Sequence, residues 1–168
     1  MLQTQTETQT SKEVIKEQLE KTKATVEWEC LTPNEYYALM VKLLGEKNYI
    51  SGRLSYYEPG SALIYIDMFH VDEKMRQMGV GTKLIKSFIA EAMQYGAKIL
   101  KGHVTSESAL RTRARVFGSE NLQFFIHGTD TRKDISYEEA LVSNFNFDVV
   151  VDLTKINTQD WEKPIRIT

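Results

Sequence analysis

The sequence is poor in the features that mark several common classes of protein. It has a single cysteine, Cys30, which can form neither an internal disulfide nor a cysteine-rich zinc site. Its apolar runs, such as residues 62–66, are far too short to cross a bilayer. The Gln/Thr-rich start lacks the basic-then-apolar pattern of a secretion signal. We therefore expect a cytoplasmic protein that neither enters a membrane nor holds a metal.

The charges are almost balanced, with 21 basic and 23 acidic residues and a net charge of −2. This balance argues against a general nucleic-acid-binding role, although it allows a local basic patch. With 168 residues, of which 42% are hydrophobic, the chain can form the packed core of one domain. Residues 1–10 are polar and of low complexity, which predicts a disordered tail before a single domain over residues 11–168.

Hydrophobic periodicity predicts alternating helices and strands. We expect helices over 12–23, 33–44, 82–95, 106–116 and part of 136–143. We expect strands over 24–30, 49–57, 62–71, 98–105, 124–127 and 145–153, with a short edge strand at 165–167. The strand 62–71 is apolar on both faces, which is typical of a central position. The fold class is therefore α/β (α+β), with a central mixed sheet flanked by helices.

The loop Arg76–Thr82 joins the expected central strand to an amphipathic helix. Its two glycines, Gly79 and Gly81, allow a ligand to approach the backbone closely. The helix start offers amide groups without intrahelical partners and a partial positive charge, which together favour a phosphate. Arg76 adds a full positive charge, and Thr82 adds a hydroxyl donor. The loop therefore predicts a phosphate-binding site.

Two familiar phosphate-binding loops do not fit these residues. A Walker loop requires Gly-Lys-Ser/Thr, whereas here the order is Gly81-Thr82-Lys83. A dinucleotide fingerprint requires a third glycine where this chain has Leu84. An unrelated α/β module that binds a nucleotide remains open as a weaker alternative.

The pattern that fits is Arg/Gln-x-x-Gly-x-Gly/Ala between a strand and a helix, and in this the sequence resembles the GNAT superfamily of N-acetyltransferases over about residues 49–118. The resemblance implies a GNAT-like acyltransferase domain with acetyl-CoA as co-substrate and no metal. It implies that the loop amides bind the pyrophosphate and that the preceding strand lines the pantetheine arm. The implied binding residues are Met68, Phe69, His70, Val71, Arg76, Gln77, Met78, Gly79, Val80, Gly81 and Thr82.

The resemblance also implies that a primary amine of an unidentified acceptor attacks the thioester directly, which requires a base. Asp67 is a candidate because its strand neighbours are apolar, an environment that suits a general base. His103 is a candidate because it lies on the presumed fifth strand and faces the gap between the strands. Further candidates are His70, Asp72 and Glu73.

The following helix departs from the family pattern Asn-x-x-Ala-x-x-x-Tyr, whose Tyr donates a proton to the departing thiolate. Ser106 takes the place of the Asn, Ala109 matches the Ala, and Arg113 takes the place of the Tyr. Arg113 is a poor proton donor, but it could stabilise a thiolate by its charge. Two functions follow: an active N-acetyltransferase, or a GNAT-fold protein that binds acyl-CoA or a macromolecule with weak or no turnover. The strand 145–153 and the C-terminal tail could pair across a homodimer.

Overall fold

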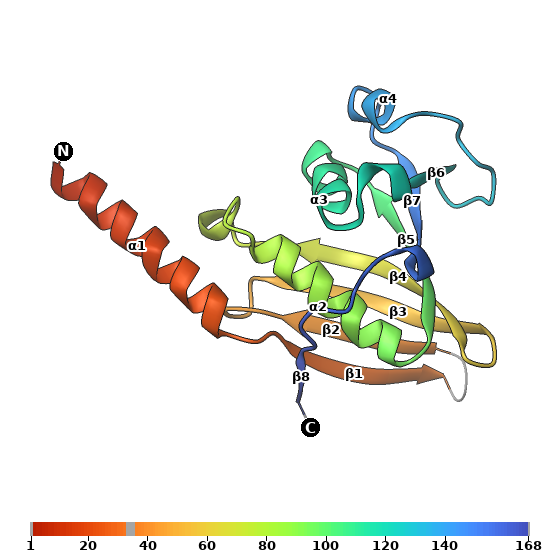
Figure 1. Ribbon diagram of the computed structural model, residues 1–168, viewed down its shortest axis with the longest axis horizontal. Coiled ribbons are helices and arrows are strands. Elements are labelled where there is room, and N and C mark those ends of the chain that lie inside the picture. Colours follow the sequence, from red (N-terminus) through yellow and green to blue (C-terminus); the bar gives the residue numbers. More distant parts are fainter. Residues whose placement is uncertain (1, 33–35, 168) are drawn as a thin grey trace.

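A mixed sheet forms the centre of the protein, for which a computed structural model describes residues 2–32 and 36–167. Within these residues the sheet has eight strands in the order β6-β7-β5-β4-β3-β2-β1-β8 (Figure 1). Neighbours are antiparallel except for β4–β5 and β1–β8. The bounds are β1 Thr25–Thr32, β2 Tyr36–Lys42, β3 Tyr49–Glu58, β4 Ser61–His70, β5 Ala97–Val104, β6 Gln123–Ile126, β7 Phe147–Asp152 and β8 Ile165–Arg166. The predicted fold class is confirmed, as is the central position of β4.

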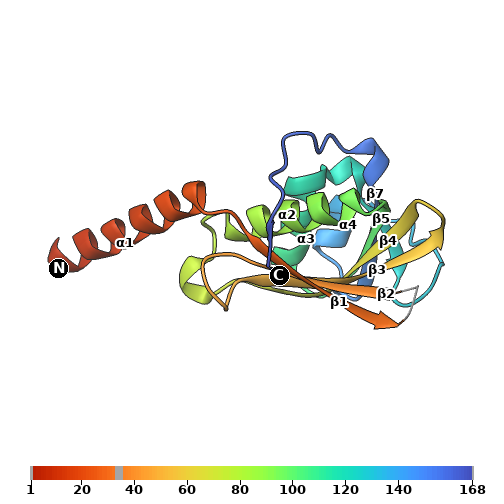
Figure 2. The ribbon, with the colours of Figure 1, turned by 90° about the horizontal axis from the view of Figure 1, so that it is seen from below.

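The main core lies between helix α2 (Val80–Gln94) and one face of the sheet (Figure 2). The predicted apolar stripe of α2 is confirmed, since Leu84, Ile85, Phe88 and Ile89 are fully buried. Burial of each such side chain contributes about 1.5–3 kcal/mol. Helix α3 (Glu107–Phe117) packs beside α2, and the short helix α4 (Tyr137–Leu141) precedes β7.

The two faces of strands β3 to β5 differ in character, because side chains alternate along a strand. One side, here called the helix face, carries the buried residues Ile64, Ile66, Leu100 and Gly102 and is covered by α2 and α3. The opposite side, here called the polar face, carries the partly or fully exposed residues Arg53, Tyr65, Lys101 and His103.

The expected helix over residues 33–44 is wrong. Residues 33–35, with most of the N-terminal helix signal, lie outside the described residues, and Tyr36–Lys42 forms strand β2. The segment is buried at alternate positions, at Leu39, Val41 and Leu43. It pairs with β1 on one side and β3 on the other. Its apolar residues are compatible with both periods, and pairing in the sheet decides between them.

Helix α1 (Leu2–Lys21) projects from the body of the protein (Figure 1). Its backbone is helical through residues 2–10, where the sequence predicts a disordered tail. The end of the helix is fixed to the domain: Leu19 packs against the core, and Lys83 Nζ donates hydrogen bonds to the carbonyls of Leu19 and Thr22. Among the described helices, none has the length and hydropathy needed to cross a membrane.

The C-terminal segment crosses α2 and adds β8 beside β1, which confirms the expected edge strand near 165–167 (Figure 2). On the way, the Trp161 ring packs against Phe117, with 6.0 Å between ring centroids. Strand β7 has β5 on one side and, over Phe147–Val150, β6 on the other. Most of its hydrogen-bonding positions are thus taken within the chain, and the expected homodimer stays a prediction.

Candidate functional site

Strands β4 and β5 part at the middle of the sheet. Their parallel pairing ends at Ile66 and Gly102, so the last residues of β4 have no partner on β5. A bulge lies at the same place: on β4, Asp67 is the extra residue between the two that pair with Ser51 and Gly52 of β3. Such a bulge bends its strand and increases its twist. A cleft of ≈1190 Å³ opens there, lined by β4, β5, α3 and the loop before α2.

The glycine loop stands at the mouth of this cleft. Gly79 is the N-cap of α2 in the left-handed conformation, with φ of 91°. The first intrahelical bond runs from Lys83 N to Gly79 O at 3.0 Å. Among the described residues, none accepts a hydrogen bond from the amides of Val80, Gly81 and Thr82. Two of these residues, Gly81 and Thr82, line the cleft together with the positive end of the helix dipole, which is the geometry that binds a phosphate.

Gly81 leaves little room for a larger residue. A Cβ at this position would lie 3.5 Å from the Phe69 ring and 3.5 Å from Val71 Cγ2, which is ordinary contact. A single methyl group fits there, but a branched side chain would extend into the space that a ligand on the loop needs. Arg76 is anchored beside the loop, since its Nε donates to Val71 O at 3.2 Å.

The structure brings most of the expected cofactor-binding residues to the cleft wall. Those that line it are Phe69, His70, Val71, Arg76, Gln77, Gly79, Gly81 and Thr82. Met68, Met78 and Val80 do not: Met68 is 53% exposed beside the bulge, Met78 is half-buried, and Val80 is in the core. These three can contribute only through their backbone groups.

Asp67 does not have the apolar surroundings that its strand position predicts. The bulge interrupts the alternation, so that both Asp67 and Met68 face solvent. The Arg53 guanidinium holds the Asp67 carboxylate in a fork, with Nη2 2.9 Å from Oδ1 and Nε within 3.1 Å of both oxygens. A carboxylate engaged in this way is poorly placed to accept a proton from a substrate.

Arg53 and Tyr65 both line the cleft, and sequence reasoning gave neither a role. Arg53 Cζ lies 5.2 Å from the centroid of the Tyr65 ring. Burial, followed by the charges of Asp148 and Asp67, raises the pKa of the Tyr65 phenol, so the hydroxyl stays protonated at neutral pH. The available signal was the position of Tyr65 on the strand that leads to the glycine loop.

His103 lines the cleft from the polar face. Its Nε2 lies 2.9 Å from Asn146 Oδ1. An amide oxygen only accepts, so Nε2 carries the proton and Nδ1 of the neutral ring is left as the basic nitrogen. The ring stacks on His127 with 3.5 Å between centroids and 14° between planes. The candidate base is therefore held in a fixed orientation.

His127 is itself fixed by a buried carboxylate. Its Nδ1 lies 2.8 Å from Asp148 Oδ1, and the Gly128 amide donates to Asp148 Oδ2 at 2.9 Å. Burial alone would raise the pKa of Asp148, but the hydrogen bonds from His127 and Gly128 and the charges of His127 and Lys101 outweigh it, and the pKa is lowered. Asp148 is therefore an anion below the two stacked rings.

Arg113 is the most unusual side chain in the cleft wall. It is only 3% exposed, and its Nη1 donates to Ala109 O at 3.1 Å. Among the described residues no carboxylate forms an ion pair with it, and burial lowers its pKa to about 10. A Cβ on Gly102 would lie 3.4 Å from Arg113 Nη2, so the guanidinium stands on the helix face at the point where β4 and β5 part.

The remaining base candidates have structural partners. Asp72 accepts a hydrogen bond from Lys74 N, and its own amide donates to Asn48 Oδ1. His70 Nδ1 lies 2.6 Å from Lys47 O. Neither Asp72 nor Glu73 lines the cleft. Of the five candidates, Asp67, His70 and His103 line the cleft. Asp67 is paired with Arg53, His70 contacts a backbone carbonyl, and His103 contacts the Asn146 side chain.

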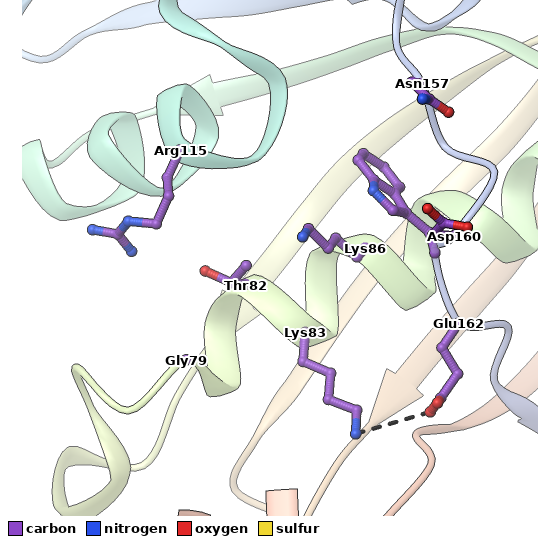
Figure 3. Close-up of a pocket in the computed structure, with 9 residues that line it drawn as sticks. Gly79, Thr82, Lys83, Lys86, Arg115, Asn157, Asp160 and Glu162 are labelled. Atoms are coloured by element: carbon purple, nitrogen blue, oxygen red, sulfur yellow. Dashed lines mark ion pairs between the residues drawn. The ribbon is translucent and has the colours of Figure 1, made fainter. Parts of the chain in front are cut away.

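A second hollow of ≈810 Å³ lies between α2, α3 and the C-terminal segment (Figure 3). Gly79, Thr82 and Arg115 line both this hollow and the cleft. It also contains Lys86, whose Nζ lies 5.8 Å from the centroid of the Trp161 ring. The C-terminal segment contributes carboxylates as well, and Figure 3 shows Glu162 directed toward Lys83, at 3.9 Å.

This arrangement of a strand, a glycine loop, a helix start and a parted pair of parallel strands suits a ligand that carries a phosphate. The chain belongs to the acetyltransferase (GNAT) family, whose family model matches residues 2–117. No curated protein has a sequence that matches the chain. The family assignment therefore rests on the family model.

Solved structures with a similar fold include three bacterial acetyltransferases. One is an acetyltransferase from Bacillus subtilis in complex with CoA, with 16% identity, coverage of 78% of this chain and 99% of that one, and a TM-score of 0.47. An IAA acetyltransferase from Bacillus cereus has 16% identity, coverage of 77% and 99%, and a TM-score of 0.46. A GNAT family acetyltransferase from Elizabethkingia anophelis with acetyl-CoA bound has 16% identity, coverage of 78% and 99%, and a TM-score of 0.46.

Proposed function

We propose that this protein is an N-acetyltransferase that transfers an acetyl group from acetyl-CoA to a primary amine by direct attack. One observation carries the proposal: Gly81 and Thr82, whose amides are free, line a cleft that opens where β4 and β5 part. Membership of the acetyltransferase family supports the general activity.

The residues of the cleft fit the co-substrate. The free amides would hold the pyrophosphate, and Arg76 would add charge beside it. Phe69 and Val71 offer apolar contact to the pantetheine arm, while unpaired backbone groups at the end of β4 can hydrogen-bond to its amides. Lys86 and Arg115 lie beside the same loop and would hold the phosphate on the ribose of CoA.

The polar face supplies the base. His103 presents its unprotonated Nδ1, because Nε2–H donates a hydrogen bond to Asn146 Oδ1, and Nδ1 accepts the proton that the attacking amine loses. Asp67 is expected from the sequence to act as a base, but it instead orients Arg53 on the polar face, from which the acceptor would approach. Arg113 lies on the opposite side of the sheet, where its charge stabilises the thiolate that leaves.

A second function is favoured by the residue at position 113. If the departing thiolate needs the phenolic hydroxyl that the family pattern places on α3, Arg113 does not provide it. The protein would then bind acyl-CoA with weak or no turnover, as a regulatory or scaffold protein.

Thiol release from acetyl-CoA in the presence of a panel of amines tests the proposal. We expect amine-dependent thiol release that falls by about 10²–10⁴-fold in His103→Gln, the usual contribution of a general base. Calorimetry with CoA should show unchanged binding in that variant. Binding of CoA without thiol release from any amine would support the second function, and the absence of CoA binding would refute both.

A further inference from the structure

We propose that Arg113 binds a carboxylate at the far end of the donor's acyl chain, so that the preferred donor is the CoA thioester of a dicarboxylic acid, such as malonyl-CoA or succinyl-CoA, over acetyl-CoA. This inference rests on the proposed function, because it assumes that the cleft holds an acyl-CoA.

The first argument is the missing counter-ion. A buried guanidinium is normally paired with a carboxylate, because removing a lone charge from water is costly. Arg113 is 3% exposed, yet among the described residues only the neutral carbonyl of Ala109 accepts a hydrogen bond from it. The neighbouring arginine of α3 shows the contrast: Arg111 is exposed and forms a fork with Glu107 at 2.9 Å. Most N–H groups of Arg113 are therefore available to a ligand.

The second argument is position along the cleft. Arg113 touches Gly102, which pairs with Ile66 at the point where the strands part. Gly81, whose amide is free, lies beside Phe69, three residues beyond Ile66 on β4, which is about 10 Å along an extended strand. A phosphate on the loop is therefore too far from the Gly102–Ile66 pair to form a hydrogen bond with a guanidinium held there. The anion that neutralises it belongs to the reacting end of the ligand.

The third argument is the side of the sheet. Arg113 stands on the helix face, whereas His103, the candidate base, projects from the polar face. An amine that gives its proton to His103 approaches from the polar face. A carboxylate held by Arg113 therefore belongs to the donor. The CoA thiolate cannot neutralise the Arg113 guanidinium before the reaction, because the thiolate forms only as the reaction proceeds.

The transfer step remains the ordinary one. The amine nitrogen forms a bond to the acyl carbon, the carbon–sulfur bond breaks, the amine proton passes to His103, and CoA leaves as the thiolate. The distal carboxylate stays paired with Arg113 and takes no part in bond making. The product is an amide that carries a free carboxylate.

Calorimetry and steady-state thiol release with CoA, acetyl-CoA, malonyl-CoA and succinyl-CoA test the inference. We expect the wild type to favour an acidic donor over acetyl-CoA by about tenfold or more, the size of one charge-assisted contact. Arg113→Met should lose this preference, and Arg113→Lys should keep part of it. Arg111→Met removes the same charge from the same helix and should leave the donor ratio unchanged.

The outcomes separate the two proposals. If acetyl-CoA equals or exceeds the acidic donors in the wild type, the inference is overturned while the proposed function stands; this holds even if Arg113→Met does not fold. If no CoA species binds, the proposed function itself fails. A further experiment compares amino acids with the corresponding amines as acceptors. If the rate depends on a carboxylate of the acceptor and not on one of the donor, the assignment of the carboxylate to the donor is overturned.

Discussion

Replacing Arg113 by methionine should make the free protein more stable. The guanidinium is buried, and no carboxylate among the described residues pairs with it. Methionine has a similar length, no charge and enough flexibility to fill the same space. Replacing a buried ion pair by apolar residues often leaves a protein equally or more stable. Replacing a buried charge that has no partner should stabilise the protein more, because no ion pair is lost.

The lowered pKa gives the magnitude. Burial lowers the pKa of Arg113 from its ordinary value to about 10, and at about 1.36 kcal/mol for each pKa unit the buried charge costs the folded state about 3 kcal/mol. Loss of the bond from Arg113 Nη1 to Ala109 O offsets about 1 kcal/mol. The net gain is about 2 kcal/mol, which for a domain of 168 residues raises the Tm by about 4–8 °C.

Thermal melts of the free protein, followed by circular dichroism, measure this shift. The pKa of Arg113 is lower in the folded protein than in the unfolded chain. The buried charge therefore destabilises the folded protein at every pH below about 10, and this cost falls only above that pH. The gain should therefore be the same at pH 6 and pH 8. Arg111→Met, which breaks an exposed pair with Glu107, should instead lower stability by about 0.3–0.5 kcal/mol. A lower Tm for Arg113→Met would refute the view that the charge is uncompensated.

Three further predictions address the loop, the first helix and a buried acid. Gly81→Ile should weaken CoA binding at least tenfold by calorimetry while the Tm changes little, and Gly81→Ala should bind nearly normally, since its Cβ has ordinary contacts. A chain that starts at Ser11 keeps Leu19 and the bonds from Lys83, so its Tm should lie within about 2–4 °C of the full chain. Burial raises the pKa of Glu91, so its charge opposes folding once the pH is above about 4.5; Glu91→Gln should raise the Tm at pH 8 but not at pH 4.

The loop and α2 could be predicted from the sequence because their signals are local. Gly79 adopts the left-handed conformation that glycine favours, and the apolar stripe from Leu84 to Ile89 occurs within one helix. Similar local signals mark β4, which follows the turn at Pro59-Gly60, and α3, whose N-cap is Ser106. For these elements, the residues that determine the structure lie next to one another in the chain.

The failures concern long-range contacts. Strand β2 became a strand because both of its neighbours pair with it, and residues 36–44 alone do not specify this. The bulge at Asp67 depends on the register between β3 and β4, and it moved a candidate base from apolar surroundings to the Arg53 fork. The stack joins His103 of β5 to His127, which lies 24 positions later in the turn after β6, and both strands pair with β7.

The same bulge gives the site its two-sided chemistry. By adding one residue to β4, it ends the pairing with β5 at Ile66 and opens a passage through the sheet. Through this passage the polar face, with His103, and the helix face, with Arg113, reach the same point from opposite sides. The proposed base and the cation are thus separated by the sheet itself, so that in the proposed reaction an incoming amine and a departing thiolate need not compete for one position. A shift of the bulge by one residue would move the point where the strands part away from both groups, even with the glycine loop intact.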